Sequence, residues 1–539
     1  MRIDLPILGP IIQLIHSSFT WIGRLLSPIV EWLGHHFAPV INYIHGDGLT
    51  VLPEMELLLF ALGILIFDFL LEKKEKHWNA GLALLGVFAS AVGLSMQVRR
   101  FNLQHDSRPD LPGILGFQNT VVIDGYSLFF AAIFLAATAL VILLSVRYLD
   151  LEREQEGEYY SLLLLACIGM MFMASGTDLI VMFLGLETMA LSFYVLSGYL
   201  RREKRSNEAA LKYLLLGGFS TGILAYGFSL LYGLTGSTSI LEVGNILDRR
   251  FQYVSGRGMA DWLLILSFVT VAAGLFFKIA AVPFHQWAPD VYEGAPTPIA
   301  TYVSVASKTA SFALLVRLFI WVFGGSQPIW QGMVAGVAIA SLTWGNLAAL
   351  TQSNIKRLLA YSSISHVGYI LLGLVAGNET GLTGIIYYLI AYAFMTSGAF
   401  AVVIVLRQRG IIGDELEDLD GLYHRSPAAA VLLLIFMLSL AGIPPTAGFM
   451  GKYFIFLALI ESHHPVLAIF AALYIVPALY YYFRVVVHAW MKKPGDAPAP
   501  FMTNAQAIAL GAALFVTLAA GLYPEPFMRL AHYALGIQR

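Results

Sequence analysis

Long runs of apolar residues, separated by short polar segments, dominate this sequence. A helix needs about 20 apolar residues to cross a hydrocarbon core about 30 Å thick, and about 14 runs are close to that length. The runs cover residues 55–72, 79–97, 125–147, 159–175, 177–200, 209–235, 261–287, 297–323, 330–350, 355–377, 380–406, 428–460, 465–490 and 503–523. The pattern predicts an all-α integral membrane protein with about 14 transmembrane helices, numbered here in the order of the runs.

Prolines interrupt two of these runs at related places. Pro283 lies in the seventh run, and Pro444 and Pro445 lie in the twelfth. A proline lacks the backbone donor, so in hydrocarbon the freed carbonyl must be satisfied by neighbouring groups or by water in a cavity. Broken helices five apart predict two inverted five-helix repeats, formed by helices 4–8 and 9–13. Simple proline kinks without a functional role are the alternative.

The runs also divide the chain into five segments. Residues 1–50 are moderately apolar but broken by prolines, and are expected to form an interfacial or loosely helical extension. The other segments are 51–150 with the first three helices, 151–325 with the first repeat, 326–495 with the second inverted repeat, and 496–539 with the final helix and the C-terminus.

Lysine and arginine gather in the loops that follow odd-numbered helices. These residues are Lys73, Lys74, Lys76, Arg147, Arg153, Arg201, Arg202, Lys204, Arg205, Lys356, Arg357, Arg407, Arg409, Arg425, Lys492 and Lys493. The positive-inside rule then places both termini on the outer side of the membrane. The arginines after the second and sixth helices run against this pattern, but those loops also carry acidic residues.

Composition narrows the possible functions. Hydrophobic residues make up 58% of the 539 residues and charged residues only 12%, against roughly 25% charged in an ordinary soluble domain. The net charge of −2 gives no reason to expect a nucleic-acid partner. Cys167 is the only cysteine, so no ligand set for an iron–sulfur cluster exists, and no other side chains show the close spacing of a metal motif. No cofactor or metal is therefore expected on this chain.

Four of the eleven lysines lie within apolar runs: Lys212, Lys278, Lys308 and Lys452. A charge at the centre of a bilayer costs on the order of 3 kcal/mol, so such residues usually face a protein interior and serve a function. Burial disfavours the charged form, which brings release of the proton within reach of neutral pH. A buried lysine can therefore act as a proton-relay station. For Lys212, near the start of the sixth helix, snorkelling to the interface is the alternative.

Two further titratable residues fit a relay. Glu187 is the one carboxylate deep in the fifth helix, and contact with a lysine would hold the proton whereas separation would release it. A static ion pair is the alternative reading of such contact. His366 lies in the serine-rich stretch YSSISHVGY and could connect the two repeats, although an ordinary buried histidine remains open. Asp68 and Arg317 lie near helix ends and are expected to have interfacial or helix-packing roles.

Five stretches resemble one known family. They are FKIAAVPFHQWAPDVYEGAPTPIATYVSVASKTA (277–310), FLGLETMALSFYVLSGY, EAALKYLLLGG, SISHVGYILLG and LAGIPPTAGFMGKYFIF. Together they are similar to the antiporter-like membrane subunits of respiratory complex I over about residues 50–525. Within that family, VYEGAPTP and a lysine in the eighth helix look like the subunit N members of bacterial NADH:quinone oxidoreductase.

The resemblance implies a role in proton translocation, driven by quinone reduction elsewhere in a complex. FMN, iron–sulfur clusters and quinone would then belong to other subunits, and the partners would be the other membrane and peripheral subunits together with the lipid of a bacterial inner membrane. It also implies roles for single residues: Glu187 as the fifth-helix glutamate, Lys212 as a lysine near it, Lys278 as its partner on the broken helix, Lys308 as the bridge toward the centre, His366 as a polar residue of the central axis, and Lys452 as the lysine near the exit.

Two alternatives remain at this point. A subunit of a multisubunit sodium/proton antiporter or of a membrane-bound hydrogenase would share the fold and the lysines. A membrane scaffold without transport activity would hold the same lysines in packed ion pairs.

Overall fold

Helices make up most of this computed structural model, which describes residues 47–72, 75–107, 113–255, 261–407, 413–494 and 499–537. The chain forms two compact units, Met1–Leu52 and Pro53–Arg539. In the first unit the described residues form one short 3-10 helix, η1 (Gly48–Val51). The predicted extension over residues 1–50 thus lies almost wholly outside the described residues, and the division into five segments stays a prediction.

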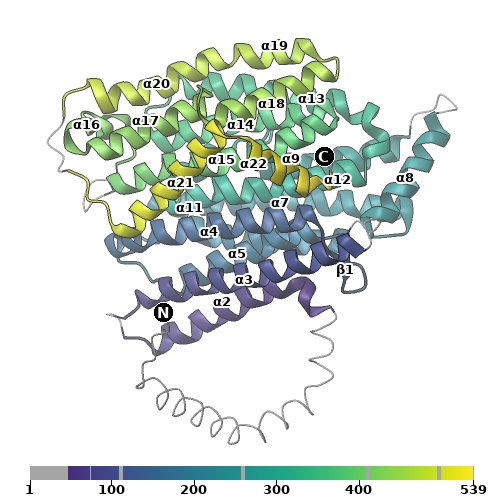
Figure 1. Cartoon of the computed structure of the whole chain (residues 1–539), viewed down its shortest axis with the longest axis horizontal. Coiled ribbons are helices and arrows are strands. Elements are labelled where there is room, and N and C mark those ends of the chain that lie inside the picture. The colour runs from purple at the N-terminus through teal and green to yellow at the C-terminus, as the bar shows by residue number, and fades with distance from the viewer. Residues whose placement is uncertain are drawn as a thin grey trace, which may run out of the picture. The chain divides into compact units, whose positions relative to one another are not determined.

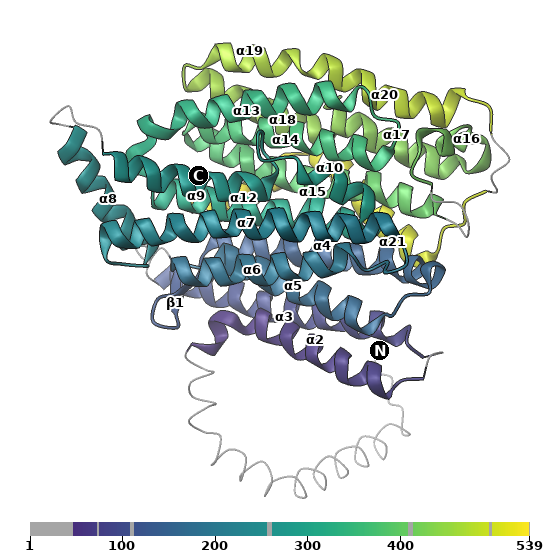
Figure 2. The same cartoon turned by 180° about the vertical axis from the view of Figure 1, so that it is seen from behind.

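Thirteen helices in the described residues are long and apolar enough to cross a membrane. Their elements are α2 (Leu52–Leu70), α3 (Trp78–Ser107), α4 (Gly125–Glu152), α5 (Gly157–Ser175), α6 (Leu179–Ser197), α7 (Lys204–Thr235), α9 (Trp262–Ile279), α11 (Thr297–Tyr302) with α12 (Lys308–Trp321), α13 (Gln327–Ala349), α14 (Ile355–Ala376), α15 (Glu379–Leu406), α19 (Pro465–Leu473) with α20 (Ile475–Met491), and α21 (Asn504–Leu522). The helices of the larger unit lie side by side (Figures 1 and 2). The predicted all-α membrane class is confirmed.

The twelfth predicted helix is the exception, because it consists of two halves. These are α17 (Pro427–Ala441) and α18 (Ala447–Glu461), each 15 residues long and so too short to cross a membrane alone. Each of the other predicted runs contains one of the long helices. The inverted relation of helices 4–8 and 9–13 stays a prediction.

Both predicted helix breaks occur at the prolines. The helix α9 ends at Ile279, Ala280 adopts a left-handed φ of 59°, and α10 (Trp287–Gly294) follows beyond a cis Val282–Pro283 bond. The helix α17 ends before Gly442, whose φ is 85°, and a cis Pro444–Pro445 bond precedes α18. Glycine tolerates that left-handed conformation because it has no Cβ atom.

Neighbouring groups satisfy the backbone at the first break, as hydrocarbon surroundings require. The amide of Val282 donates to Ser341 Oγ at 2.9 Å, and the indole of Trp287 donates to the Phe277 carbonyl at 2.8 Å. Side chains of α10 and α13 therefore hold the first break in place.

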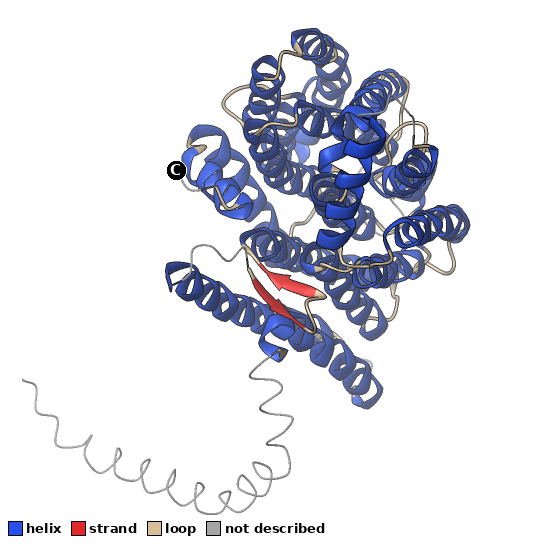
Figure 3. Cartoon of the chain, turned by 90° about the vertical axis from the view of Figure 1, so that its right-hand side faces the viewer, coloured by secondary structure: helices blue, strands red, loops and turns tan. Residues whose placement is uncertain are grey.

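Several elements were not predicted. They are the antiparallel hairpin β1 (Ile114–Gly116) and β2 (Val121–Ile123), the helices α8 (Ile240–Ser255), α16 (Leu422–Arg425) and α22 (Glu525–Leu535), the 3-10 turns η3 (Gly324–Ser326) and η4 (Leu416–Leu419), and the π-helix η2 (Val303–Ser307) between α11 and α12. The hairpin is the red element in Figure 3. The helices α8 and α22 are amphipathic, so neither forms a continuous apolar run.

Ion pairs join loops that follow odd-numbered predicted helices. Arg407 follows the eleventh helix and binds Glu152 at 2.7 Å and Glu203 at 3.4 Å, which follow the third and the fifth. Lys356 follows the ninth helix and binds Asp414, after the eleventh, at 3.1 Å. Loops that touch one another lie on one side of the membrane, so these contacts agree with helices that cross in alternating directions.

Arg317 and Asp124 form a buried ion pair. It lies at the other ends of the helices, away from the loops that Arg407 and Lys356 join. Arg317 Nη2 on α12 lies 3.0 and 3.1 Å from the two carboxylate oxygens of Asp124, and the guanidinium lies 4.8 Å from the ring centroid of Tyr126. Asp124 also caps α4, because it accepts from the Ser127 amide and forms a capping box with that residue. Arg317 thus has the helix-packing role, and only 2% of its side chain is exposed.

We predict that Asp124→Asn lowers thermal stability. Asparagine keeps the helix cap but leaves the Arg317 charge buried and unpaired, a loss of about 3 kcal/mol. Asp124→Ala should lose about 1 kcal/mol more because the cap is lost as well. The measurement is the unfolding midpoint of the protein in mild detergent. Glu525→Gln is the matched control, since it breaks an exposed pair with Arg529 and should have little effect. Equal midpoints for Asp124→Asn and the control would contradict the prediction.

Candidate functional site

Lys278 lies in the last turn of α9, at the first helix break, and is 3% exposed. Its ammonium donates to the Tyr194 hydroxyl at 3.3 Å and lies 5.7 Å from the centroid of that ring. Glu187, on the same helix as Tyr194, is close enough to interact electrostatically with Lys278. Among the residues described, however, no direct ion pair joins the two, and Glu187 Oε1 is buried without a hydrogen-bond partner. The predicted partners are near each other but not in contact.

Lys212 is not buried, which fits the snorkelling alternative rather than a relay site inside the helix bundle. Its side chain is 42% exposed, and its ammonium binds Asp290 and Glu208, each at 2.7 Å. The ion pairs of Lys212 therefore go to α10 and to its own helix rather than to Glu187. The physical reason is its position only two turns into α7, from which the long side chain reaches the helix end.

Lys212 belongs to a network of charged residues around α10, the helix that follows the first break. Asp290 also binds Arg357 at 2.8 Å, and Arg357 binds Glu293 at 2.9 Å. Arg205 lies 3.8 Å from Glu293. The network thereby ties α7 and α10 to the first turn of α14. Sequence reasoning missed the two carboxylates, although their spacing within DVYEG puts them on one face of a helix.

Lys308 is buried where the predicted repeats meet. It follows the π-helix η2 directly, is 1% exposed, and donates to Ser363 Oγ on α14. Its ammonium lies 5.6 Å from the ring centroid of Tyr292. No carboxylate forms an ion pair with Lys308 in the part of the chain that the structure describes. A π-helix inside an α-helix often marks a functional position, because it changes the direction of the side chains that follow.

His366 is linked to Lys308 and Lys452 through aromatic neighbours. Its ring packs against Tyr392, which lies 2.6 Å from Ser363 beside Lys308. It also packs against Tyr388, which stacks on Tyr369 next to Lys452. Its Nδ1 is 2.7 Å from the Tyr388 hydroxyl and its Nε2 is 3.1 Å from the Tyr482 hydroxyl. Both ring nitrogens are thus held by hydroxyl groups, each of which can donate or accept a proton.

Lys452 on α18 binds the end of the other half-helix. Its ammonium donates to the carbonyls of Ala441 at 2.8 Å and Leu440 at 3.3 Å, and it lies 4.8 Å from the ring centroid of Tyr369. A Cβ atom on Gly442 would come within 3.0 Å of Lys452 Nζ. The carbonyls at the C-terminus of α17 carry partial negative charge, which stabilises a cation. The free carbonyls at the second break therefore bind the ammonium group of Lys452.

Three of the four buried lysines share one kind of environment, whereas the fourth, Lys356, forms an ion pair with Asp414. Hydroxyl groups, carbonyls and aromatic faces surround Lys278, Lys308 and Lys452, and none of them forms an ion pair with a described carboxylate. An ammonium without a carboxylate partner can lose its proton without leaving an unpaired anion behind. This arrangement permits proton exchange, whereas a tight ion pair would oppose it.

Sequence reasoning missed most of the tyrosines of the site, and only Tyr369 stood in the polar stretch singled out around His366. Tyr194, Tyr292, Tyr369, Tyr388, Tyr392 and Tyr482 contact the lysines or His366 directly or through one serine. Aromatic residues within an apolar run usually fill space, so the sequence gave no sign that these tyrosines belong to the site. A usable signal is the spacing of Tyr388 and Tyr392, which places two hydroxyls on one face of α15.

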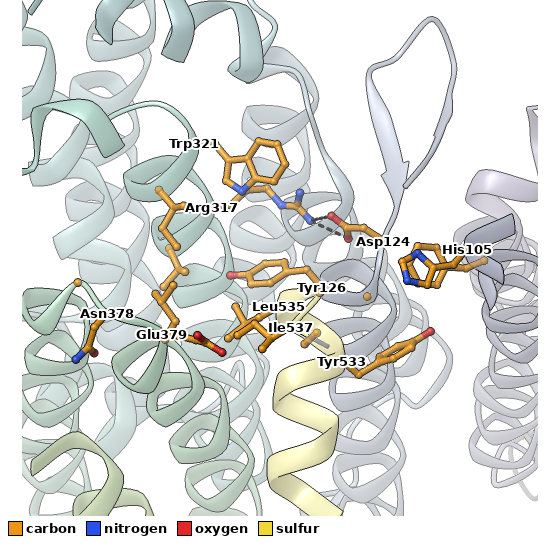
Figure 4. Close-up of a pocket in the computed structure, with 18 residues that line it drawn as sticks. His105, Asp124, Tyr126, Arg317, Trp321, Asn378, Glu379, Tyr533, Leu535 and Ile537 are labelled. Carbon is orange, nitrogen blue, oxygen red and sulfur yellow. Dashed lines mark hydrogen bonds and ion pairs between the residues drawn. The ribbon is translucent and has the colours of Figure 1, made fainter. Parts of the chain in front are cut away.

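A cavity of about 870 Å³ lies elsewhere, between α3, α4, α12, α15 and α22. Figure 4 shows its lining, in which the Arg317–Asp124 pair forms part of the wall beside Tyr126. None of the predicted site residues lines this cavity. In the described parts of the chain no group of three or more His, Cys, Asp or Glu residues could hold a metal ion. The predicted site residues thus lie away from this cavity.

Sequence comparison gives close relatives. Residues 176–476 match the family described as NADH:quinone oxidoreductase/Mrp antiporter, TM. The NADH-quinone oxidoreductase subunit N 1 of Koribacter versatilis is 50% identical over 91% of this chain and 96% of its own length. Subunit N 2 of Solibacter usitatus is 48% identical over 92% of this chain and 98% of its own length.

Structural comparison gives the same fold in larger assemblies. A chain of respiratory complex I from Thermus thermophilus with bound aureothin has a TM-score of 0.71 and 30% identity, over 88% of this chain and 98% of that chain. A chain of the archaeal membrane-bound sulfane sulfur reductase gives a TM-score of 0.78 at 23% identity, over 90% of this chain and 97% of that chain. A chain of the Mrp complex from Dietzia gives 0.73 at 22%, over 89% and 96%. The last two show a shared fold alone.

Proposed function

The chain belongs to the family of NADH-quinone oxidoreductase subunit N, and on this premise we propose that it translocates protons through its buried lysines as a membrane subunit of respiratory complex I. The proposed site consists of Glu187, Lys212, Lys278, Lys308, His366 and Lys452. The observation that carries the proposal is the run of hydroxyl and aromatic contacts that links Lys308, His366 and Lys452, two lysines that have no ion pair with a described carboxylate.

Each residue has a distinct part in the proposed relay. Glu187 supplies the opposite charge that favours a proton on Lys278, and movement between them changes that preference. Lys308 and His366 connect the first repeat to the second, and Lys452 holds the proton at the second break. Lys212 lies at the edge of the site, where its ion pair with Asp290 joins α7 to α10 and so holds the broken helix in position.

The energy for translocation comes from outside this chain in the proposal. Quinone reduction occurs in other subunits, which hold FMN, the iron–sulfur clusters and the quinone. The partners are the other membrane and peripheral subunits of the complex, and a change of their conformation has to reach the Glu187–Lys278 pair. Proton transfer then responds to that change through the distance between two charges.

The alternative of a sodium/proton antiporter or hydrogenase subunit is less well supported. The relatives named subunit N are 38–50% identical over nearly their whole length, whereas the sulfur reductase and Mrp chains are 22–23% identical. A scaffold without transport activity also fits poorly, because Lys308 and Lys452 have no ion pair with any described carboxylate.

We predict that Lys278→Ala and Glu187→Ala each impair proton pumping together with NADH:quinone turnover. Each variant removes one of the two charges whose separation is proposed to control the proton. The measurement is acidification of inverted membrane vesicles driven by NADH, alongside NADH oxidation. Lys204→Ala is the control, because Lys204 is an exposed lysine at the start of α7. Normal pumping in both site variants would refute their relay roles.

We further propose that the protein lies in the bacterial inner membrane with both termini in the periplasm. The support is the distribution of lysine and arginine in the loops and the contacts among loops that follow odd-numbered helices. In this orientation Arg202 faces the cytoplasm and Glu461 the periplasm.

Thiol labelling tests the orientation, because Cys167 is the only cysteine and is buried. Arg202 and Glu461 are both exposed. We predict that a membrane-impermeant maleimide labels Glu461→Cys in intact spheroplasts but labels Arg202→Cys only in inverted vesicles. The reverse pattern would overturn the proposed orientation, and the unsubstituted chain should remain unlabelled in both preparations.

A further inference from the structure

The two predicted repeats meet at a buried cluster of hydroxyl groups. Lys308 donates to Ser363 Oγ, and that oxygen lies 2.6 Å from the Tyr392 hydroxyl. The Tyr392 hydroxyl is also 2.9 Å from Ser304 Oγ, which precedes Lys308 by four residues. Three helical segments therefore converge on Tyr392, and all four residues are buried.

Tyr392 also contacts the next titratable group along the site. Its ring centroid lies 5.4 Å from that of His366. His366 lies as close to Tyr388, with 5.8 Å between the ring centroids, and Tyr388 precedes Tyr392 by one helical turn on α15. The imidazole is thus flanked by two tyrosines of one helix, and its Nδ1 is bonded to the Tyr388 hydroxyl.

We propose that the Tyr392 hydroxyl carries the proton from Lys308 toward His366. The proposal rests on the lysine relay proposed above and names a group that transfers the proton within it. The route passes from the ammonium to Ser363, from Ser363 to Tyr392, and from Tyr392 to the imidazole.

The transfer conserves protons and leaves no charge on either hydroxyl. Lys308 gives one proton to Ser363 Oγ, the original hydroxyl proton of Ser363 moves to the Tyr392 oxygen, and the original hydroxyl proton of Tyr392 moves to a ring nitrogen of His366. The ammonium becomes an amine and the imidazole becomes an imidazolium. A concerted shift avoids a buried alkoxide or tyrosinate, which would be costly in these surroundings.

The last step needs a rotation of the His366 ring. Its nitrogens are held by Tyr388 and Tyr482, so one of them has to turn from Tyr388 to Tyr392. The two tyrosines are adjacent on one helix face, which makes this a side-chain movement rather than a helix movement. Tyr392 would then connect His366 to Lys308 through Ser363, whereas the ring of Tyr388 stacks on Tyr369, which lies next to Lys452.

Tyr392→Phe tests the proposal in the whole complex, in inverted membrane vesicles. The variant removes one oxygen and keeps the ring that packs against His366. We expect NADH-driven proton pumping to fall at least about tenfold, a smaller effect than the roughly 100- to 10,000-fold that a proton-transferring group contributes to a reaction. The matched control is Tyr387→Phe. Tyr387 is another buried tyrosine of α15, but its hydroxyl donates to the Ala520 carbonyl and not to a residue of the site. Equal pumping by the two variants would overturn the proposal.

A second measurement separates proton transfer from positioning. A more acidic fluorotyrosine at position 392 restores the hydroxyl and its hydrogen bonds, so a positioning role predicts the pH profile of the unsubstituted complex. Proton transfer through this hydroxyl predicts restored pumping with a shifted pH profile. Restored pumping with an unshifted profile would overturn the proposal.

The outcome also distinguishes this proposal from the one on which it rests. If Lys278→Ala abolishes pumping and Tyr392→Phe behaves as Tyr387→Phe does, the lysine relay stands and the role of Tyr392 falls. If Lys278→Ala and Glu187→Ala both pump normally, the relay itself is wrong, whatever the result at Tyr392.

Discussion

A positive charge inside a membrane protein must be stabilised by the groups around it, and the site of this protein depends on how that is done. Lys278, Lys308 and Lys452 are buried, and their ammonium groups are stabilised by hydroxyls, helix-end carbonyls and aromatic faces. Each of these groups interacts with a cation but is neutral itself, so it does not bind the proton in place as a carboxylate in contact would.

Arg317 shows the contrasting solution in the same protein. Its guanidinium is as buried as the lysines, but it forms two short contacts to Asp124, and that carboxylate also caps a helix. Arginine stays charged at any physiological pH and exchanges no proton, so a permanent carboxylate partner stabilises the fold without blocking proton transfer. The pair joins α4 to α12, whereas the lysines lie where a fixed partner would prevent exchange. The environment of each cation thus separates a structural charge from an exchangeable one.

The need to stabilise buried positive charges also explains the two helix breaks. At the second break, the carbonyls of Leu440 and Ala441 are free because α17 ends there, and Gly442 leaves room for the ammonium of Lys452. At the first break, Lys278 lies in the last turn of the half-helix, where a cation is favoured. Proline at each break ends a helix inside the membrane and so creates polar groups at a depth where a continuous helix offers none.

The sequence predicts the helices and the breaks well, because apolar runs and prolines are local signals. Residue type also located Lys278, Lys308, His366 and Lys452, since a charged or titratable residue in an apolar run is rare enough to stand out. For Lys212 the sequence left burial and snorkelling open, because the exposure of its side chain depends on how α7 and α10 end. Apart from Tyr369, the tyrosines were missed for a different reason: a tyrosine is common in membrane helices, and only the packing of α14 against α15 brings Tyr392 next to Ser363.

The central claim is that the buried lysines function by releasing a proton, and Lys308→Arg tests it most directly. Arginine keeps the positive charge but does not release its proton near neutral pH. The measurement is the number of protons moved per NADH oxidised by the complex in membrane vesicles, with assembly checked in the same preparation. The account predicts that an assembled Lys308→Arg complex moves fewer protons per NADH. Full proton pumping by that complex would show that the charge alone suffices, and would contradict the account.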